Sequence, residues 1–228
     1  DAAAVVQTSL ERDGVRVLLG HKAIEARAGE PHLLVVEHEG TRTELAFDLL
    51  LVAVGRTANV DGFGLETLGI PLRRNRTIET DDYLRTRFPN ILAVGDVTGP
   101  FQLTHAGAHQ AWYAAVNALF GRFKSFRADY RVLPAATYTD PELARVGINE
   151  REAEAQGIAV EVIVHPFSEL DRAIAEGATE GFVKVLVPPG KDTILGATVV
   201  GARAGDLIAV FALAMKHNLG LDKILGNV

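Results

Sequence analysis

The sequence contains no cysteine and only one methionine and one tryptophan among its 228 residues. Without cysteine the chain cannot form a disulfide framework or a thiolate metal site, and this composition suits a reducing compartment such as the cytoplasm, where we expect the protein. Apolar runs are short as well. None reaches the roughly 18 to 20 residues that cross a bilayer, and no secretory signal is visible, so we expect no membrane partner.

Positive charge is also scarce. The formal net charge is −6 at pH 7 and the isoelectric point is about 5.7, which argues against a nucleic-acid partner. Hydrophobic residues, in contrast, are abundant: they make up 48% of the chain, and charged residues make up 23%. This globular composition is sufficient for a sizeable core in one large domain or two ordinary ones.

The two ends of the sequence carry few of the signals that usually begin and end a fold. The sequence opens within a helix pattern, residues 1–12, and closes on an apolar stretch, residues 216–228, that has no terminating signal. We therefore interpret the sequence as part of a longer polypeptide.

The first half of the chain has the pattern of an α/β fold. The run LLLVAV, residues 49–54, lacks polar alternation, which predicts a strand buried on both faces of a parallel sheet, and residues 91–94 predict a second buried strand. Apolar positions at helical spacing predict a helix over residues 104–120, with Gly121 at its end and Trp112 in the core. Further predicted elements are a helix at residues 2–12 and strands at residues 15–19, 23–26, 33–38 and 42–46.

The character of the sequence changes near residue 126, where we place a domain boundary. Strands dominate beyond it, and two helices, at residues 149–156 and 203–218, accompany them. The strands are predicted at residues 135–138, 160–167, 181–187 and 194–201. A mostly antiparallel sheet with helices packed on it is an α+β arrangement.

The stretch ILAVGDVTG, residues 91–99, ends an apolar run on Gly95 and Asp96 shortly before the helix pattern that begins near Thr104. Turn chemistry alone explains this pair, because Asp caps turns and Gly relaxes the backbone. A binding site explains it too, since α/β sheets bind ligands at the carboxyl ends of strands and an ionised carboxylate suits a sugar or polyol hydroxyl. The helix start adds free N–H groups and a positive dipole end, which would stabilise negative charge on a bound ring system.

Several sequence blocks occur in an order that resembles a known family. They are LLVAVGRTAN (50–59), ILAVGDVTG with LTHAGAHQA (91–111), TYTDPELARVG (137–147), FSELDRAIAEG (167–177), GFVKVLV (181–187) and ILGATVVGARAGDLI (194–208). This order resembles the pyridine nucleotide-disulfide oxidoreductases, which include dihydrolipoamide dehydrogenase, glutathione reductase and mercuric reductase. The resemblance covers essentially the whole chain.

The resemblance implies an α/β plus α+β fold class, with a partial FAD- and NAD(P)-binding remnant followed by a C-terminal dimerisation domain with a mostly antiparallel sheet. Residues 1–52 resemble the second half of the NAD(P)-binding domain. Residues 53–125 resemble the C-terminal part of the FAD-binding domain, and residues 126–228 resemble the dimerisation domain, truncated at its C-terminus. The implied partner is a second copy of the chain in a homodimer.

The resemblance also implies which residues lie beside the cofactors. Asp96 would bind the ribityl chain of FAD, next to Gly95. The backbone of Leu103, Thr104 and His105 would lie beside the flavin. The residues expected along the path of NAD(P)H are Ala53, Gly55 and Val183.

In this family electrons pass from NAD(P)H through FAD to a cysteine pair and then to the substrate. Because the chain has no cysteine, the resemblance implies no catalytic residue in it, and an inactive fragment of an active enzyme. The block LTHAGAHQAWYAAVNALFG, residues 103–121, is most similar to mercuric reductase-type proteins, with dihydrolipoamide dehydrogenase as the alternative. The substrate would be a small molecule, a small disulfide or a metal ion. A hypothesis of another class is that the chain as it stands is a non-catalytic dimerisation module.

Two groups of polar residues suggest other chemistry. His105 and His109 have the i, i+4 spacing of a zinc site, but the sequence shows no third ligand, so we predict no bound metal. Glu169, Asp171 and Arg172 could form an acid–base site, and we predict instead a solvated loop with local ion pairs.

Overall fold

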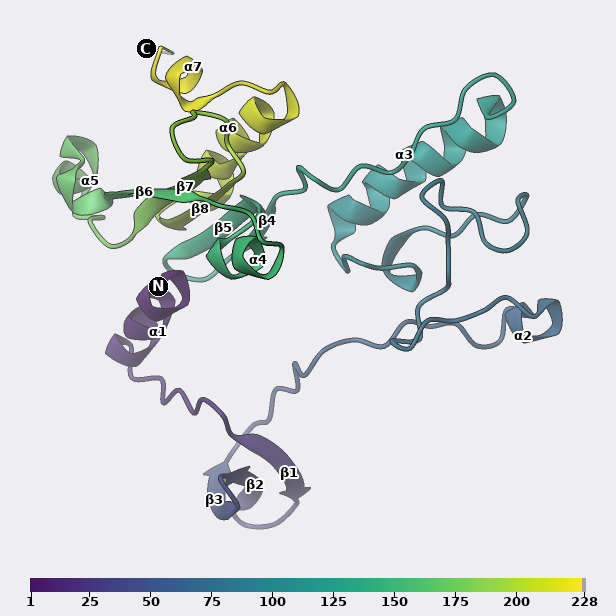
Figure 1. The fold of residues 1–228 in the computed structure, drawn as a ribbon. Helices are drawn as coiled ribbons and strands as arrows, with labels where there is room; N and C mark the ends of the chain where they lie inside the picture. The colour runs from purple at the N-terminus through teal and green to yellow at the C-terminus, as the bar shows by residue number, and fades with distance from the viewer. Residues whose placement is uncertain (227–228) are drawn as a thin grey trace. The chain divides into compact units, whose positions relative to one another are not determined.

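The computed structural model describes residues 1–226, and its backbone contacts divide the chain into two compact units. One unit is Gln7–Arg56, and the other consists of Asp1–Val6 and the chain from Thr57 onward. Figure 1 shows the elements of both units. The domain boundary near residue 126 falls inside the second unit and stays a prediction, as does the boundary at residue 52. Among residues 1–226, no helix has both the length and the apolar character needed to cross a membrane.

The unit Gln7–Arg56 is built on a three-stranded antiparallel sheet in the order β1-β2-β3. Three of the five strands predicted here are confirmed: β1 (Lys22–Arg27), β2 (His32–His38) and β3 (Thr41–Phe47). Glu39 and Gly40 join β2 to β3, and both have positive φ, 49° and 78°. A two-residue turn with positive φ at both positions is a type I′ hairpin, whose twist matches that of the flanking strands.

Three predicted strands are wrong. Residues 49–54 form no strand in the structure, and Leu49 is 90% exposed. Residues 15–19 and 91–94 form none either, apart from a single bridge at Leu92. A strand is stable when neighbouring strands pair with its N–H and C=O groups. Every sheet within residues 1–226 is antiparallel, so these segments lack the parallel neighbours that their sequence pattern requires.

The segment between residues 57 and 103 is mostly irregular and folds around a small apolar core. That core comprises Ala58, Val60, Ile70, Ile78 and Ala93. The guanidinium of Arg73 ties the surrounding loops together because it donates hydrogen bonds to several backbone carbonyls. These carbonyls belong to Ile78, Thr98 and Thr80, at 2.6, 2.9 and 3.1 Å. The regular elements of the segment are α2 (Leu65–Leu68) and the 3-10 turn η1 (Gly95–Val97).

Helix α3 (Thr104–Phe120) has its predicted length, but it buries the opposite face from the one expected. Its buried residues are Ala106, Gln110, Tyr113 and Asn117. The apolar stripe faces outward, and Trp112 is 55% exposed, so its predicted place in the core is wrong. The helix packs by a polar face because the amides of Gln110 and Asn117 bond to backbone groups of the adjoining loops.

The C-terminal part of the chain folds into a five-stranded antiparallel sheet in the order β4-β5-β8-β7-β6. Its strands are β4 (Ala135–Thr137), β5 (Glu142–Gly147), β6 (Glu161–Pro166), β7 (Phe182–Val187) and β8 (Gly196–Gly201). This sheet confirms the predicted α+β arrangement. The sequence analysis missed β5, because Glu142 and Arg145 interrupt the apolar signal that marks the other strands.

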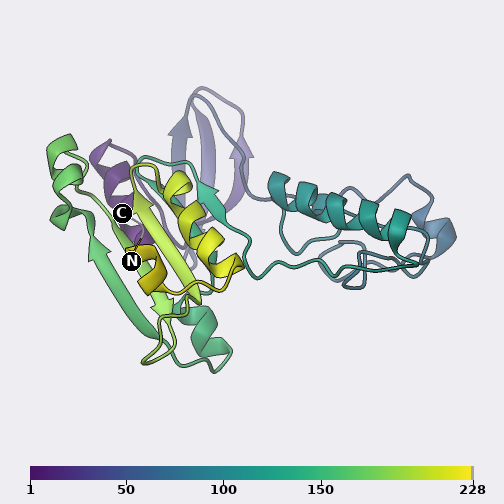
Figure 2. The ribbon, with the colours of Figure 1, turned by 90° about the horizontal axis from the view of Figure 1, so that it is seen from above.

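Helix α6 (Ala204–Lys216), which confirms the helix predicted at residues 203–218, covers one face of this sheet and contacts β4, β5 and β8 (Figures 1 and 2). The core between them includes Ala144, Val146, Val185, Val199, Ile208 and Ala214. The ring of Phe167 fills the space above Gly201, where an added Cβ would meet the ring at 2.2 Å. Since Gly201 also has a φ of 147°, the position requires glycine.

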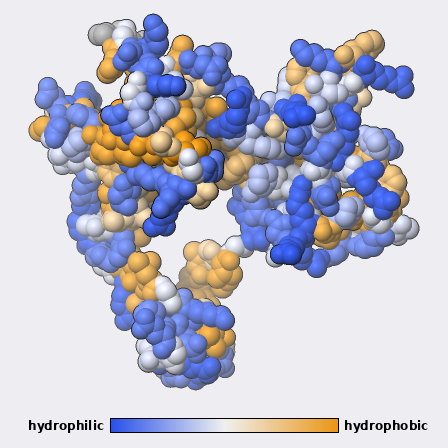
Figure 3. Space-filling view, in the orientation of Figure 1, coloured by the Kyte–Doolittle hydropathy of each residue, from blue (hydrophilic) through white to orange (hydrophobic). Residues whose placement is uncertain are grey.

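Strand β6 forms one edge of the sheet and leaves apolar side chains in solvent. Val162, Ile163 and Val164 are all exposed. Figure 3 shows hydrophobic surface in the area where β6 and β7 lie in Figure 1. This edge is therefore an apolar surface of the sheet domain.

The remaining elements are α1 (Ala2–Arg12), α4 (Glu150–Ala155), η2 (Phe167–Glu169), α5 (Asp171–Glu176) and α7 (Leu221–Leu225). Helix α4 confirms the helix predicted at residues 149–156, and it begins with a capping box. The side chain of Asn149 accepts from the Glu152 N–H, and the Glu152 carboxylate accepts from the Asn149 N–H, both at 2.9 Å.

The loop predicted around Glu169, Asp171 and Arg172 is wrong, because Asp171 and Arg172 begin helix α5. The predicted local ion pair is present within that helix. Arg172 pairs with Glu176 one turn later, and the guanidinium is largely in solvent. The pair supports a short exposed helix and has the i, i+4 geometry of many surface helices.

Lys184 is a buried cation on the face of β7 opposite α6. Its side chain is 5% exposed, and its Nζ donates to Asp1 at 2.6 Å and to Glu150 at 2.5 Å. Both carboxylates remain partly in solvent. Burial acts to raise the pKa of Glu150, but the hydrogen bond from Lys184 helps to lower it, and the net pKa lies below its ordinary value.

We expect Glu150→Ala to cost more stability than Lys184→Met. The first change leaves a buried ammonium with one partner, which we expect to cost about 1–3 kcal/mol in the free energy of unfolding. The second replaces that ammonium with an apolar side chain of similar length and leaves carboxylates that water can reach, so it should stay within about 1 kcal/mol. Urea unfolding at pH 7 measures both, with the exposed Glu154→Ala in the same helix as the control.

The pH dependence of the free energy of unfolding provides a second test of this ion pair. Because the pKa of Glu150 is lowered, the stabilisation from this pair is complete above the ordinary value of 4.5 and is lost as the pH falls through the lowered value. The difference between the unaltered chain and Glu150→Ala should therefore shrink in acid. A larger loss in Lys184→Met than in Glu150→Ala would contradict this account.

Candidate functional site

The Gly95–Asp96 pair lies in the 3-10 turn η1 and directly precedes the segment that leads into α3. Gly95 has a φ of 80°, a conformation that favours glycine. The turn is closed by the Thr98 N–H and the Thr98 hydroxyl, which both donate to the Gly95 carbonyl at 3.0 Å. A Cβ added at Gly95 would meet no heavy atom of the described residues within 4 Å. The turn therefore leaves open space at Gly95 that a ligand can approach.

The start of α3 adjoins this turn. The N-cap residue is Leu103, whose apolar side chain cannot accept a hydrogen bond from the first helical N–H groups. Gly107 packs close to the turn, because a Cβ added there would lie 3.4 Å from the Gly95 Cα. The structure thus brings together the predicted residues Gly95, Asp96, Leu103, Thr104 and His105.

The buried amide of Gln110 links the turn to the helix, and the sequence analysis missed it. Its Oε1 accepts from the Gly95 N–H at 2.5 Å and lies 3.4 Å from the Thr98 hydroxyl oxygen. Its Nε2 donates to the Gly99 carbonyl at 3.0 Å and to the Tyr130 hydroxyl at 2.9 Å. Burial raises the pKa of Tyr130 above its ordinary value of 10.0.

The two histidines of α3 form hydrogen bonds with backbone carbonyls. The Nε2 of His105 donates to the Pro134 carbonyl at 2.7 Å, and the Nε2 of His109 donates to the Asp129 carbonyl at 2.9 Å. These bonds hold the linker, residues 127–134, that leads into β4. Within residues 1–226 no group of three or more His, Cys, Asp or Glu side chains is placed to hold a metal ion.

The linker is also held from the sheet side. The hydrogen bonds from Arg131 hold the pKa of the Asp129 carboxyl well below its ordinary range, and Lys216 of α6 adds a contact at 3.4 Å. The linker therefore has polar attachments to both α3 and α6.

The other predicted site residues lie elsewhere. Ala53 and Gly55 belong to the unit Gln7–Arg56, whereas the turn at Gly95 belongs to the other unit. Val183 lies in β7, and its partly buried side chain packs against the core of the sheet domain.

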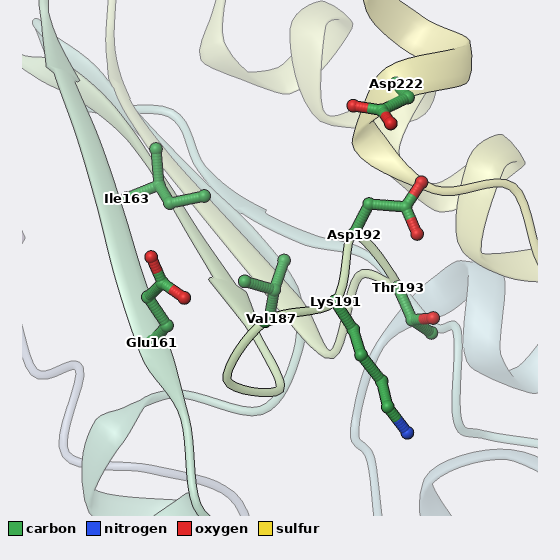
Figure 4. Close-up of a pocket in the computed structure, with 8 residues that line it drawn as sticks. Glu161, Ile163, Val187, Lys191, Asp192, Thr193 and Asp222 are labelled. Atoms are coloured by element: carbon green, nitrogen blue, oxygen red, sulfur yellow. The ribbon is translucent and has the colours of Figure 1, made fainter.

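A shallow hollow of about 530 Å³ lies beside β6 and the β7–β8 connection (Figure 4). Acidic side chains line it, namely Glu161, Asp192 and Asp222. Asp192 has a structural explanation, since its carbonyl accepts from the Leu221 N–H at 2.9 Å and its carboxylate packs on Gly220, where an added Cβ would meet it at 1.8 Å. The hollow contains none of the predicted site residues.

Comparison with known proteins identifies the relationship. The model for the family described as pyridine nucleotide-disulphide oxidoreductase matches residues 1–116, and the model for the dimerisation domain of the same family matches residues 133–228. The chain belongs to the pyridine nucleotide-disulphide oxidoreductase family. Both matches confirm the family resemblance found in the sequence, and the match over residues 133–228 contains the five-stranded antiparallel sheet described above.

Curated relatives in this family include dihydrolipoyl dehydrogenases. The protein from Mycobacterium leprae is 33% identical over 98% of the chain and 48% of the relative. The protein from Thermus scotoductus is 37% identical over 95% of the chain and 47% of the relative. The chain thus spans about half the length of these relatives.

Solved structures of family members have the same fold. LpdA from Mycobacterium tuberculosis superimposes with a TM-score of 0.85 at 29% identity, over 97% of the chain and 47% of that protein. The HOCl-induced flavoprotein disulfide reductase RclA from Escherichia coli gives a TM-score of 0.83 at 28% identity, over 96% of the chain and 50% of that protein.

Two glycine substitutions test the packing of the turn on α3. Gly95→Ala should cost about 1–2 kcal/mol of stability, because an L-residue is strained at this φ even though space is open. Gly107→Ala should be neutral or stabilise by up to about 1 kcal/mol, because the residue is helical and the added Cβ makes an ordinary contact. Urea unfolding of both variants measures the difference. Equal effects, or a costly Gly107→Ala, would show that the turn and the helix pack differently.

Proposed function

We propose that the chain forms the C-terminal cofactor-binding and dimerising part of an FAD-dependent, NAD(P)H-linked disulfide reductase of the dihydrolipoyl dehydrogenase type. The observation that carries this proposal is the alignment of dihydrolipoyl dehydrogenases along 95% or more of the chain. The open turn at Gly95, with a carboxylate next to it and a helix N-terminus beside it, supports FAD as the ligand.

In this proposal the chain binds and orients the flavin. Asp96 accepts a hydrogen bond from a ribityl hydroxyl, and Gly95 allows close approach because it lacks a side chain. The first N–H groups of α3, at Leu103, Thr104 and His105, face the ring system and stabilise negative charge on it. The bound flavin supplies hydride and electron transfer. Ala53, Gly55 and Val183 stay proposed contacts along the path of NAD(P)H.

The choice of branch differs from the first expectation. The sequence block at residues 103–121 favoured mercuric reductase-type proteins, whereas the curated relatives found are dihydrolipoyl dehydrogenases, which favours the alternative. Neither chemistry can be completed by this chain alone, because disulfide exchange and mercuric ion handling need thiols and the 228 residues contain no cysteine.

Asp96→Ala should weaken binding of FAD to the chain by about 10- to 100-fold, since a charge-assisted hydrogen bond contributes about 1.5–3 kcal/mol. Equilibrium titration with FAD, followed by flavin fluorescence, measures the dissociation constant. Asp61→Ala is the matched control, because it removes the same charge from an exposed position that pairs with Arg76.

Each outcome of this titration decides something. Equal dissociation constants for Asp96→Ala and the unaltered chain would remove Asp96 from the site. An unaltered, folded chain that does not bind FAD would overturn the proposed flavin function and would favour the second candidate, a dimerisation module without cofactor.

We propose further that two copies of the chain pair through the outer side of α6. Leu207, Val210 and Leu213 recur every third residue on that side and are exposed. An apolar stripe on one helix is self-complementary about a two-fold axis, as a homodimer requires. Phe211, which the apolar pattern of this helix also includes, packs instead against the core of its own sheet.

Leu213→Glu should convert the dimer to a monomer, because it places a carboxylate within the apolar contact at a position that is 61% exposed in the single chain. Val164→Glu on the edge strand β6 is the comparator, since that side chain is 52% exposed and its neighbours Val162 and Ile163 are also exposed and apolar. Sedimentation equilibrium across micromolar concentrations measures the association. Dissociation by Val164→Glu alone would place the interface at the β6 edge, and a monomeric unaltered chain would reject the homodimer.

A further inference from the structure

The side chain of Gln110 stands between the turn at Gly95 and the linker, residues 127–134, that enters the sheet domain. It is completely buried. Three of its hydrogen-bonding positions are used, by the Gly95 N–H, the Gly99 carbonyl and the Tyr130 hydroxyl, and the Thr98 hydroxyl oxygen lies 3.4 Å from its Oε1. Among residues 1–226, the other polar side chains of α3 reach one side only: His105 and His109 bond to the linker, and Asn117 bonds to Phe126 and Tyr83.

The orientation of this amide follows from its partners. The Gly95 N–H only donates, so the atom that faces it has to be the oxygen. The Gly99 carbonyl only accepts, so the atom that faces it has to be the NH₂ group. A flipped amide would oppose donor to donor and acceptor to acceptor in a site without solvent, so the side chain fixes both ends of the turn in one arrangement.

The other buried amide of the helix, that of Asn117, binds a different part of the chain. Asn117 accepts from the Phe126 N–H and donates to the Phe126 carbonyl, both at 2.8 Å, and it donates to the Tyr83 carbonyl at 3.4 Å. It therefore holds the chain after α3 and does not contact the turn. The two amides have the same chemistry on the same buried face, and only Gln110 reaches Gly95.

We propose that Gln110 is a positioning residue that sets the flavin-binding conformation of the Gly95–Gly99 turn and joins that turn to the linker of the sheet domain. It acts through the Gly95 backbone and through the Tyr130 hydroxyl, and it does not itself contact the flavin. This inference rests on the proposed FAD site for its functional meaning, whereas the hold on the turn can be measured without any flavin.

The experiment compares Gln110→Met with Asn117→Leu in the full 228-residue chain. Both changes replace a buried amide by an apolar side chain of similar size. The first readout is the Gly95 amide proton in a ¹⁵N-correlated spectrum of the flavin-free protein, because a short hydrogen bond displaces this resonance downfield. The second readout is the dissociation constant for FAD.

We expect Gln110→Met to move the Gly95 resonance upfield and to weaken FAD binding by about tenfold, the change that loss of one hydrogen bond produces. Asn117→Leu should leave both unchanged, even where it lowers global stability by a similar amount. Gln110→Glu keeps an acceptor opposite Gly95 and should keep the Gly95 resonance downfield. Tyr130→Phe, which touches the amide only from the linker side, should still shift the resonances of Gly95 and Gly99.

The outcomes separate the inference from the function on which it rests. An unchanged Gly95 resonance in Gln110→Met, or equal losses of FAD affinity in Gln110→Met and Asn117→Leu, would overturn the positioning role. If Gln110→Met fails to fold, Tyr130→Phe remains as the test. Unchanged amide resonances of Gly95 and Gly99 in Tyr130→Phe would overturn the connection to the linker. A chain that never binds FAD while Gly95 responds as expected would refute the flavin site and retain the hold of Gln110 on the turn.

Discussion

The polar packing of α3 is the constraint on which the arrangement of the middle of the chain depends. A helix that buries amides has to bring backbone partners to them, because a buried polar group without a partner is costly. In α3 the amide of Gln110 bonds to the turn at Gly95 and to the Tyr130 hydroxyl of the linker, residues 127–134. His105 and His109 bond to backbone carbonyls of the same linker. The segments that carry no regular structure of their own are thus ordered by the side chains of one helix.

The sheet domain is held by a different kind of force. Its core is apolar, it is covered by α6, and close approaches such as Phe167 over Gly201 leave little freedom in the register of the strands. The one buried lysine of its central strands, Lys184, is neutralised by carboxylates that come from distant segments of the chain. Such an ion pair contributes modestly to stability but disfavours other packings of the strands, since a misplaced partner would leave a buried charge unpaired.

The sequence predicted the elements whose signals are local and whose partners lie within the chain. Helices α3 and α6 and the strand β7 are of this kind. It failed for LLLVAV at residues 49–54, because an apolar run predicts a buried strand only where neighbouring strands exist to pair with it. It also assigned Trp112 to the core, since periodicity shows which face of a helix is apolar and does not show which face is covered. Gln110 was missed for the same reason, although the buried spacing 106, 110, 113 and 117 is visible as a row of small and polar residues. Gly95 and Asp96 were singled out because an apolar run ends on them, whereas Leu103, Thr104 and His105 were found through family resemblance. The roles of all five stay predictions.

The outward position of Trp112 has a consequence for how the molecule can be observed. It is the single tryptophan of the sequence, it lies half in solvent on α3, and its ring meets Tyr113 edge-on at 5.0 Å between centroids. Its emission therefore comes from one known place, two residues along the helix from Gln110. Water quenches the emission of an exposed indole and shifts it to longer wavelength. The emission maximum of Trp112 therefore reports whether the outer face of α3 is exposed to solvent or covered by another surface.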